Sequence, residues 1–146
     1  MYSFFELTRL RIIKIVSRLH VMIYFASRGK ILKRLVGGPM CFVEMSGSKT
    51  NKLHIIPLLY IPYQSGAILV ASQGGSKKNP QWYYNLSSNP IVAIHAQGKK
   101  KQATARLIRG TERIVMWNIC LERYSGYQNY QDRTAREIPI FFLSFN

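Results

Sequence analysis

The chain has 146 residues, of which 47% are hydrophobic, so it can bury one hydrophobic core and is not predicted to be disordered. Twenty-one Lys and Arg against six Asp and Glu give a formal net charge of +15, which favours a polyanionic partner such as nucleic acid, anionic lipid or a phosphorylated ligand. Two distant cysteines and three scattered histidines argue against a disulfide framework and against a zinc site.

The first third of the chain is predicted to be helical. Two faces recur at helical spacing, a basic one and an apolar one, formed by Arg11, Lys14 and Arg18 and by Phe5, Ile12, Val16 and Leu19. The helix, or a second one after it, is expected to end near Gly37-Gly38-Pro39. Residues 1–37 are therefore predicted to be a basic amphipathic helical segment. It would either dock on an anionic membrane surface or pack on the sheet with a solvated charged face.

Residues 38–146 are predicted to form a mainly β domain with two helical inserts. The expected strands are Met40–Met45, Leu53–Ile61, Ala67–Gln73, Ile91–Gln97, Gln102–Arg109 and Ile138–Phe145. The expected helices are Asn79–Ser88, with Asn79 and Pro80 as cap and first residue, and Thr111–Tyr124. Short strands with helices only as crossovers favour a barrel-like sheet. Gly98-Lys99-Lys100-Lys101 is expected to be a charged hairpin turn.

The segment from Gly74-Gly75 to Asn79-Pro80 carries the strongest functional signal. It follows a strand, contains Lys77 and Lys78, and leads into an aromatic helix. Glycine amides, lysine charge and a helix N-terminus are the elements of an anion site, and the aromatic side chains offer flat surface to a planar ligand. The alternative is an ordinary strand-to-helix turn with solvated lysines.

Two further segments could contribute to a site. The turn from Ser46 to Lys52 is rich in hydroxyl groups and lysine, and it is either a second anion contact or a polar hairpin turn. Tyr124, Tyr127 and Tyr130 recur at a spacing of three, which places their rings on one side of a helical or 3₁₀ turn. Their hydroxyl groups could orient a substrate or relay a proton, or the rings could simply fill a core.

Together these motifs resemble the deazaflavin-dependent nitroreductase family, which belongs to the flavin-binding split barrels. The resemblance covers about His20 to Phe145. It is carried by the run from Gly74 to Leu86 followed by Asn89-Pro90, by Pro57-Leu58-Leu59-Tyr60, and by the tyrosine series with Gln131, Arg133-Thr134 and Ile138-Pro139. It implies a split β-barrel with flanking helices, including an N-terminal helix.

The resemblance also implies an activity and its cofactor. The cofactor is the reduced 8-hydroxy-5-deazaflavin coenzyme, coenzyme F-420, which would pass a hydride to a quinone, an activated alkene or a nitro-aromatic. The implied acceptor-side residues are Ser72, Tyr124, Tyr127 and Tyr130, with Trp82 in the same pocket. The implied cofactor-binding residues are Ser48, Lys49, Thr50, His54, Pro57, Leu58, Val70, Ala71, Ser72, Gln73, Lys78, Gln81, Trp82, Tyr83 and Asn85. No metal is expected.

Two arginines of the family pattern are replaced here by Ser48 and His54, so two bidentate phosphate donors are absent. FMN is therefore kept as an alternative cofactor, and a non-catalytic flavin- or lipid-binding barrel as an alternative function. A nucleic-acid-binding module, suggested by charge alone, has no supporting motif. The expected partners are a small-molecule electron acceptor, a second copy in a homodimer and a peripheral membrane contact, with no nucleic acid. The expected location is the cytoplasm, at the inner face of the membrane if the helix docks there.

Overall fold

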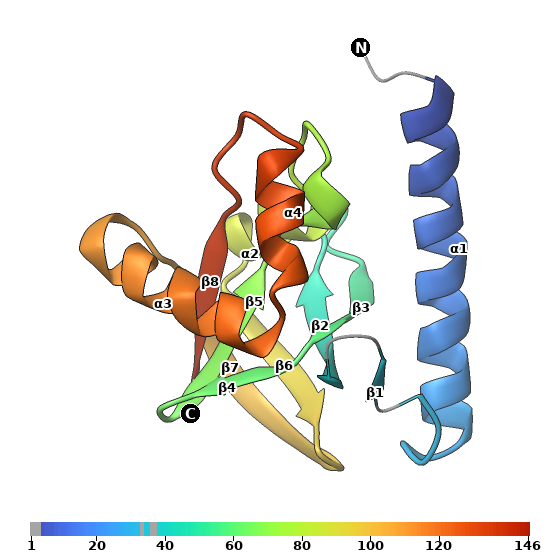
Figure 1. Cartoon of the computed structure of the whole chain (residues 1–146). Coiled ribbons are helices and arrows are strands. Elements are labelled where there is room, and N and C mark those ends of the chain that lie inside the picture. The colour runs from blue at the N-terminus through green and yellow to red at the C-terminus, as the bar shows by residue number, and fades with distance from the viewer. Residues whose placement is uncertain (1–3, 33, 36–37) are drawn as a thin grey trace.

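The computed structural model describes residues 4–32, 34–35 and 38–146. Helices flank a curled antiparallel sheet, and the N-terminal helix stands beside it (Figure 1). The elements are α1 (Phe4–Ala26), β1 (Arg34–Leu35), β2 (Gly38–Ser46), β3 (Leu53–Leu59), β4 (Ile61–Tyr63), β5 (Gly66–Val70), the 3₁₀ turn η1 (Gln73–Gly75), α2 (Gln81–Ser88), β6 (Ile91–Ala96), β7 (Lys99–Leu107), α3 (Gly110–Arg123), α4 (Gly126–Asp132) and β8 (Ile140–Phe145).

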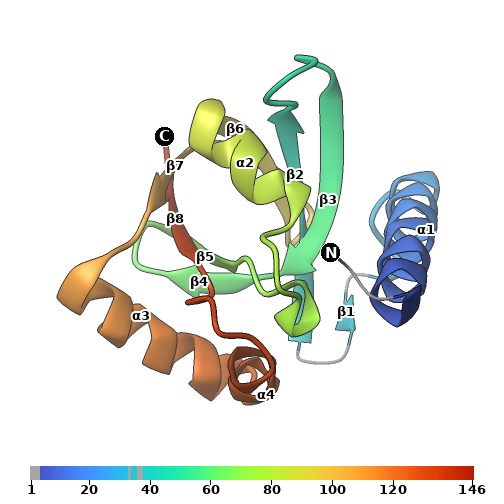
Figure 2. The same cartoon turned by 90° about the horizontal axis from the view of Figure 1, so that it is seen from above.

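The sheet curls, and the short connection between β3 and β4 joins its two ends through the chain. The strand order is β1-β2-β6-β7-β8-β5-β4, and β3 pairs with β2. Only Tyr60 separates β3 from β4, so consecutive strands pair with β2 at one side and with β5 at the other. Figure 2 shows the resulting curl from above. The family resemblance predicted this mainly β split barrel correctly.

Two hydrophobic clusters lie on opposite faces of the curled sheet. The barrel core is formed by inward residues of β2, β5, β6, β7 and β8, and α2 adds Trp82 and Leu86 to it. The second cluster lies between β5, β8 and the helices α3 and α4, which contribute Met116, Cys120 and Tyr127. Alternation along β8 explains this, because successive side chains such as Ile140 and Phe141 point to opposite faces. The second cluster fixes α4 against the sheet.

The N-terminal helix is shorter than predicted. It ends at Ala26, where Arg28 and Gly29 adopt positive φ angles of 52° and 75° and the Gly29 amide donates to the Tyr24 carbonyl oxygen at 2.8 Å. This left-handed ending closes the helix before the predicted stop, which includes Gly37 and lies partly outside the described residues. Among the residues that the structure describes, no helix combines the length and apolar character needed to cross a membrane.

Three predicted boundaries in the barrel were wrong for local backbone reasons. The strand predicted at 53–61 breaks at Tyr60. The strand predicted at 67–73 stops at Val70, because left-handed φ angles at Gln73, Gly74 and Gly75 turn the chain away from the sheet. The predicted lysine turn lies at Gln97-Gly98 instead, where both φ angles are positive, and its lysines belong to β7.

The helical inserts were predicted more closely. Helix α2 begins at Gln81 with extended Pro80 as its cap residue, so Asn79 is not the cap. Helix α3 spans Gly110–Arg123, one residue earlier at each end than predicted. Tyr127 and Tyr130 lie on a separate short helix, α4, whereas Tyr124 is the C-terminal cap residue of α3.

Candidate active site

A cavity of about 210 Å³ lies between the barrel wall and α4. Its lining brings together residues predicted separately for the cofactor and for the acceptor. The lining residues are Met40, Pro57, Leu58, Leu59, Val70, Ser72, Tyr124, Tyr127 and Tyr130. Met40 and Leu59 are additions that no motif marked, since an apolar residue in a strand is ordinarily read as core.

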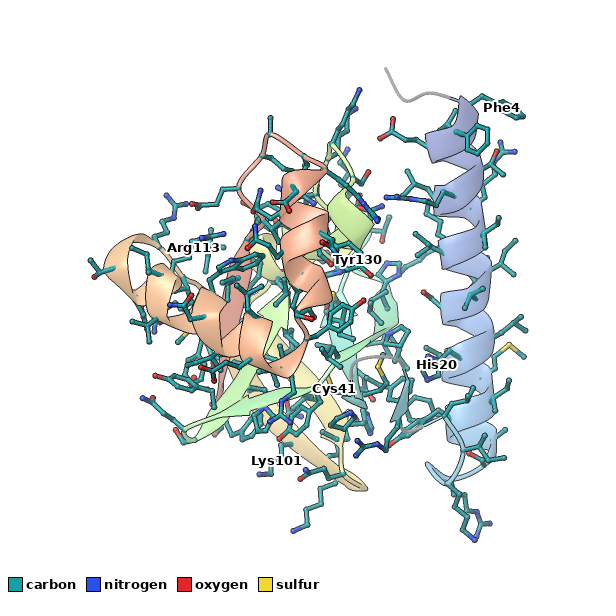
Figure 3. The ribbon with its side chains drawn as sticks, in the orientation of Figure 1. Phe4, His20, Cys41, Lys101, Arg113 and Tyr130 are labelled. Carbon is teal, nitrogen blue, oxygen red and sulfur yellow. The ribbon has the colours of Figure 1, made fainter. Side chains whose placement is uncertain are left out.

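The three tyrosines form one wall of this cavity. The hydroxyl oxygens of Tyr124 and Tyr130 lie 3.2 Å apart and share a hydrogen bond, while the Tyr127 ring packs edge-on against both neighbours. Gly126 makes this packing possible, because a Cβ there would lie 2.3 Å from Cζ of Tyr124. Figure 3 shows Tyr130 on α4, facing the strands.

Tyr127 and Tyr130 keep their hydroxyl protons at neutral pH. The hydrogen bond that Tyr130 shares with Tyr124, reinforced by burial, raises the pKa of Tyr130, although Arg133 and Arg9 act in the opposite direction. Burial raises the pKa of Tyr127. The cavity therefore presents hydroxyl groups that can donate a hydrogen bond to a carbonyl oxygen.

The loop after β5 is held by two arginines that the motifs did not include. Arg136 donates from Nε to the Ser76 carbonyl oxygen at 2.8 Å and from Nη2 to those of Ser72 and Ala71 at 2.9 and 3.1 Å. Arg9 of α1 donates to the carbonyl oxygens of residues 73 and 74, both at 3.2 Å. Arg136 lies between two motif segments quoted for the resemblance, and no local pattern distinguishes it from a surface arginine.

Three side-chain oxygens of the same loop are buried and have no hydrogen-bond partner among the residues that the structure describes. They are Oε1 of Gln73, Oγ of Ser76 and Oδ1 of Asn79. Buried acceptors that lack a donor are costly, so they favour a ligand that brings N–H or O–H groups to this loop. Lys77 and Lys78 are exposed beside them. A planar polar ring carrying phosphate would satisfy both features.

The turn between β2 and β3 is tied to α2. Oδ1 of Asn85 accepts hydrogen bonds from the Ser48 amide at 3.0 Å and from Nε2 of Gln81 at 3.4 Å. Asn85 is only 3% exposed, so this tie is a buried one. Thr50 and His54 fold over Gly47, where a Cβ would lie 2.8 Å from Oγ1 and 2.9 Å from Nε2 respectively.

The polar groups of this turn face solvent, and its lysine supplies the charge. Lys49, Thr50 and His54 are exposed, and Ser48 is half-buried. Lys52 adds a second exposed ammonium group at the end of the turn. This arrangement can attract an anionic tail, but as point charges rather than as the bidentate fork that arginine provides.

Three predicted site residues lie in the barrel core and do not line the cavity. Ala71 and Trp82 are buried there, and the Trp82 ring lies 6.0 Å from that of Phe141. Tyr83 is half-buried, with its ring 5.7 Å from the same phenylalanine. The aromatic run of α2 therefore packs mainly against the sheet, which is the usual role of a helix's apolar face.

Similarity to known proteins covers the whole of this site. A family model described as F420H(2)-dependent quinone reductase matches residues 16–144. Over 131 residues, the chain is 34% identical to the F420H(2)-dependent quinone reductase Rv1261c of Mycobacterium tuberculosis. The aligned region covers 87% of this chain and 88% of that protein.

Two solved structures share the fold at comparable identity. One is described as an F420-H2 dependent reductase (FDR-A); it is 34% identical, with a TM-score of 0.68, and covers 73% of this chain and 94% of its own. The other is described as a domain-swapped dimer; it is 29% identical, with a TM-score of 0.71, and covers 97% of this chain and 100% of its own.

Proposed function

The chain belongs to the F420H(2)-dependent quinone reductase family and is a deazaflavin-dependent oxidoreductase that uses reduced coenzyme F-420, and on that premise we propose how its residues serve the reaction. A quinone would occupy the cavity between β5 and α4. The observation that carries this placement is the hydrogen-bonded hydroxyl pair of Tyr124 and Tyr130 in the wall of that cavity. Other flat electrophiles, such as an activated alkene or a nitro-aromatic, would use the same surface.

When bound, the reduced deazaflavin supplies the hydride. The loop after β5 would hold its ring, because the orphaned oxygens of Gln73, Ser76 and Asn79 match ring N–H and hydroxyl donors. Val70 and Ser72 line the cavity from the same segment, so a ring held by this loop would lie next to the acceptor. The exposed lysines of the two loops would bind the anionic tail: Lys49, Lys52, Lys77 and Lys78.

The hydroxyl groups of Tyr124 and Tyr130 would orient the acceptor and stabilise the negative charge that develops on it. Reduction of a quinone by hydride leaves negative charge on a carbonyl oxygen, and a protonated hydroxyl group donates to that oxygen. The raised pKa of Tyr130 keeps its proton in place at neutral pH. Tyr124, 3.2 Å away, can donate to Tyr130 and support it in turn.

The test combines cofactor titration with turnover. Purified protein should bind reduced coenzyme F-420 at micromolar concentration and reduce menadione with it. Tyr130→Phe should lower kcat by about tenfold to a hundredfold with a smaller change in coenzyme Kd, because the hydroxyl acts on the acceptor. Tyr63→Phe, a tyrosine on β4 that lies outside the cavity lining, is the matched control and should retain kcat. An unchanged kcat for Tyr130→Phe would remove the assigned role.

A second candidate cofactor is FMN. Ser48 and His54 favour it, because a single phosphate needs fewer donors than a phosphate with an acidic tail. Titration with FMN beside coenzyme F-420 separates the two. Tighter FMN binding together with turnover on reduced FMN would replace the deazaflavin assignment for this chain.

The assembly we propose is a homodimer. The relative described as a domain-swapped dimer supports this, since it aligns with 97% of this chain. Light scattering after size-exclusion chromatography tests the proposal, and a monomer mass across the micromolar range would contradict it.

A further inference from the structure

A second cavity, of about 280 Å³, opens at the end of the sheet where β6 turns into β7. This hairpin cavity has a wall that includes Tyr60, Ile94, Ala96, Lys99, Lys101 and Phe145. None of these residues lines the cavity proposed for the acceptor. Figure 1 shows the β6–β7 hairpin at the lower end of the sheet, whereas α2 packs on the barrel core nearer the upper end. The hairpin cavity is therefore a separate feature, which the proposed function does not use.

Two lysines stand at inward positions of β7. Further along this strand, Ala103 and Ala105 belong to the barrel core. Because side chains alternate along a strand, Lys99 and Lys101 share the face of these alanines. Both line the hairpin cavity, and Figure 3 shows Lys101 at this end of the sheet, away from Tyr130. The inward face of β7 thus changes from apolar to basic at the cavity.

In the described part of the chain, no acidic side chain balances these two charges. Lys100, which lies between them, points to the outer face, where its Nζ lies 2.9 Å from Oε2 of Glu44. All six acidic residues of the chain are described, and none of them lines the hairpin cavity. The Nζ of Lys101 instead lies 4.5 Å from the centre of the Phe145 ring. Two ammonium groups that face one cavity repel each other, so this arrangement favours an anion between them.

Tyr60 brings a third donor to the hairpin cavity. This residue, between β3 and β4, is only 6% exposed. Its amide donates to the Pro39 carbonyl oxygen at 2.8 Å, but its hydroxyl group has no hydrogen-bond partner among the residues that the structure describes. Burial raises the pKa of Tyr60, so the hydroxyl group keeps its proton and can donate it to a ligand. A buried hydroxyl group without a partner is costly, which favours a ligand that accepts a hydrogen bond.

The remaining wall of the hairpin cavity is apolar. Ile94 and Phe145 pack with the barrel core, and the small side chain of Ala96 leaves room beside them. A cavity of about 150 Å³ is large enough for benzene, so the hairpin cavity has room for one ring that carries a carboxylate group. We propose that the hairpin cavity binds a small aromatic carboxylate.

The charged and apolar parts of the wall divide this ligand between them. Its carboxylate group accepts hydrogen bonds from Lys99, Lys101 and the Tyr60 hydroxyl group, and its ring packs against the apolar residues. The inference does not depend on coenzyme binding or on turnover.

The experiment is a titration of the full, isotopically labelled chain with benzoate, followed by amide NMR spectra. Benzoate should bind with a Kd of about 1 mM or tighter, and the largest shifts should lie at the turn formed by Gln97 and Gly98. Benzamide keeps the ring without the charge, and acetate keeps the charge without the ring. Each should bind at least about tenfold more weakly than benzoate.

Variants of the donors test the charged part of the cavity. Lys99→Gln combined with Lys101→Gln should weaken benzoate binding by at least about tenfold, because both ammonium groups are lost. Tyr60→Phe should weaken it by about tenfold, because a hydrogen bond to a charged acceptor is lost. Lys100→Gln is the matched control: it removes the same charge from the same strand, but on the outer face, and should leave the Kd within about twofold of the original.

Ala96→Leu tests the cavity itself and keeps all three donors. The larger side chain should fill the space for the ring and weaken benzoate binding by at least about tenfold. Spectra of the variants without ligand show that each keeps its fold.

Three results would overturn the proposal. The first is equal affinity for benzoate and benzamide. The second is an unchanged Kd in the Lys99/Lys101 variant or in Ala96→Leu. The third is a set of shifts confined to residues of the cavity between β5 and α4, which would place benzoate at the acceptor site instead.

Discussion

Gly75 packs directly against the backbone of Tyr130, in the wall of the cavity. Its φ is +78°, and a Cβ there would lie 2.4 Å from the Tyr130 carbonyl oxygen and 2.9 Å from Cβ of Arg133. Neither neighbour is the flexible end of a side chain, so Gly75→Ala must shift α4 or the loop. The left-handed conformation costs alanine about 1–2 kcal/mol, and the added clash costs about 1–3 kcal/mol more. We expect a loss of about 3 kcal/mol in the free energy of unfolding.

Gly98→Ala isolates the part of that loss that comes from the clash. Gly98 has nearly the same φ, +74°, but a Cβ there would meet nothing within 4 Å. It should therefore lose only about 1 kcal/mol in urea unfolding. Because Gly75 contacts the backbone of Tyr130, Gly75→Ala should also lower turnover, whereas Gly98→Ala should not. Equal losses of stability in the two variants would refute the argument that close packing at Gly75 holds the tyrosine wall.

Three further predictions concern buried groups. Arg136→Ala removes three hydrogen bonds to loop carbonyl oxygens and should lower the free energy of unfolding in urea by about 3 kcal/mol. Arg123→Ala, at an exposed residue, is the control and should lower it by less than about 0.5 kcal/mol. A loss below about 1 kcal/mol for Arg136→Ala would contradict this. Burial disfavours ionisation of Glu44, but His95 and Lys100 outweigh it and lower the pKa of Glu44. The stability that ionised Glu44 contributes is complete above the ordinary Glu pKa of about 4.3 and is lost as pH falls through the lowered pKa of the folded state. Glu44→Gln should therefore lower the free energy of unfolding by about 1 kcal/mol at neutral pH and by less below about pH 4. A loss of stability that does not change with pH would argue against the pairing of Glu44 with His95 and Lys100. Burial raises the pKa of Cys41 and of Cys120 to about 12, so Ellman's reagent at mildly alkaline pH should label these thiols only after unfolding, and prompt labelling of the native protein would be inconsistent with their burial.

The sequence predicts most barrel strands because their apolar residues are local and continuous. It predicts the helical turn that carries Tyr127 and Tyr130 for the same reason, since a spacing of three is a property of neighbouring residues. Two of the misplaced strand ends share one cause: the left-handed residues Gln73 and Gln97 carry no signal of their own, and a neighbouring glycine decides the turn. Glycines therefore mark these turns, but not the residue at which each strand stops.

The residues that assemble the site from a distance could not be predicted in this way. Arg136 acts on carbonyl oxygens 60 to 65 positions away, and Arg9 on those 64 and 65 positions away. Both depend on which segments the curled sheet brings together, and a basic chain offers many arginines that look equivalent in the sequence. The sequence left the surroundings of α1 open for a related reason, since periodicity defines an apolar face but does not say what covers it.

Arg9 connects α1 to the loop after β5. Its guanidinium group donates to the carbonyl oxygens of Gln73 and Gly74, on the loop that we propose for the coenzyme ring. Removing hydrogen bonds from a charged donor costs about 1.5–3 kcal/mol, so Arg9→Ala should weaken coenzyme binding by about tenfold as the loop loosens. Isothermal titration of the variant beside the original chain measures this change. Normal coenzyme affinity for the variant would show that α1 does not support the loop.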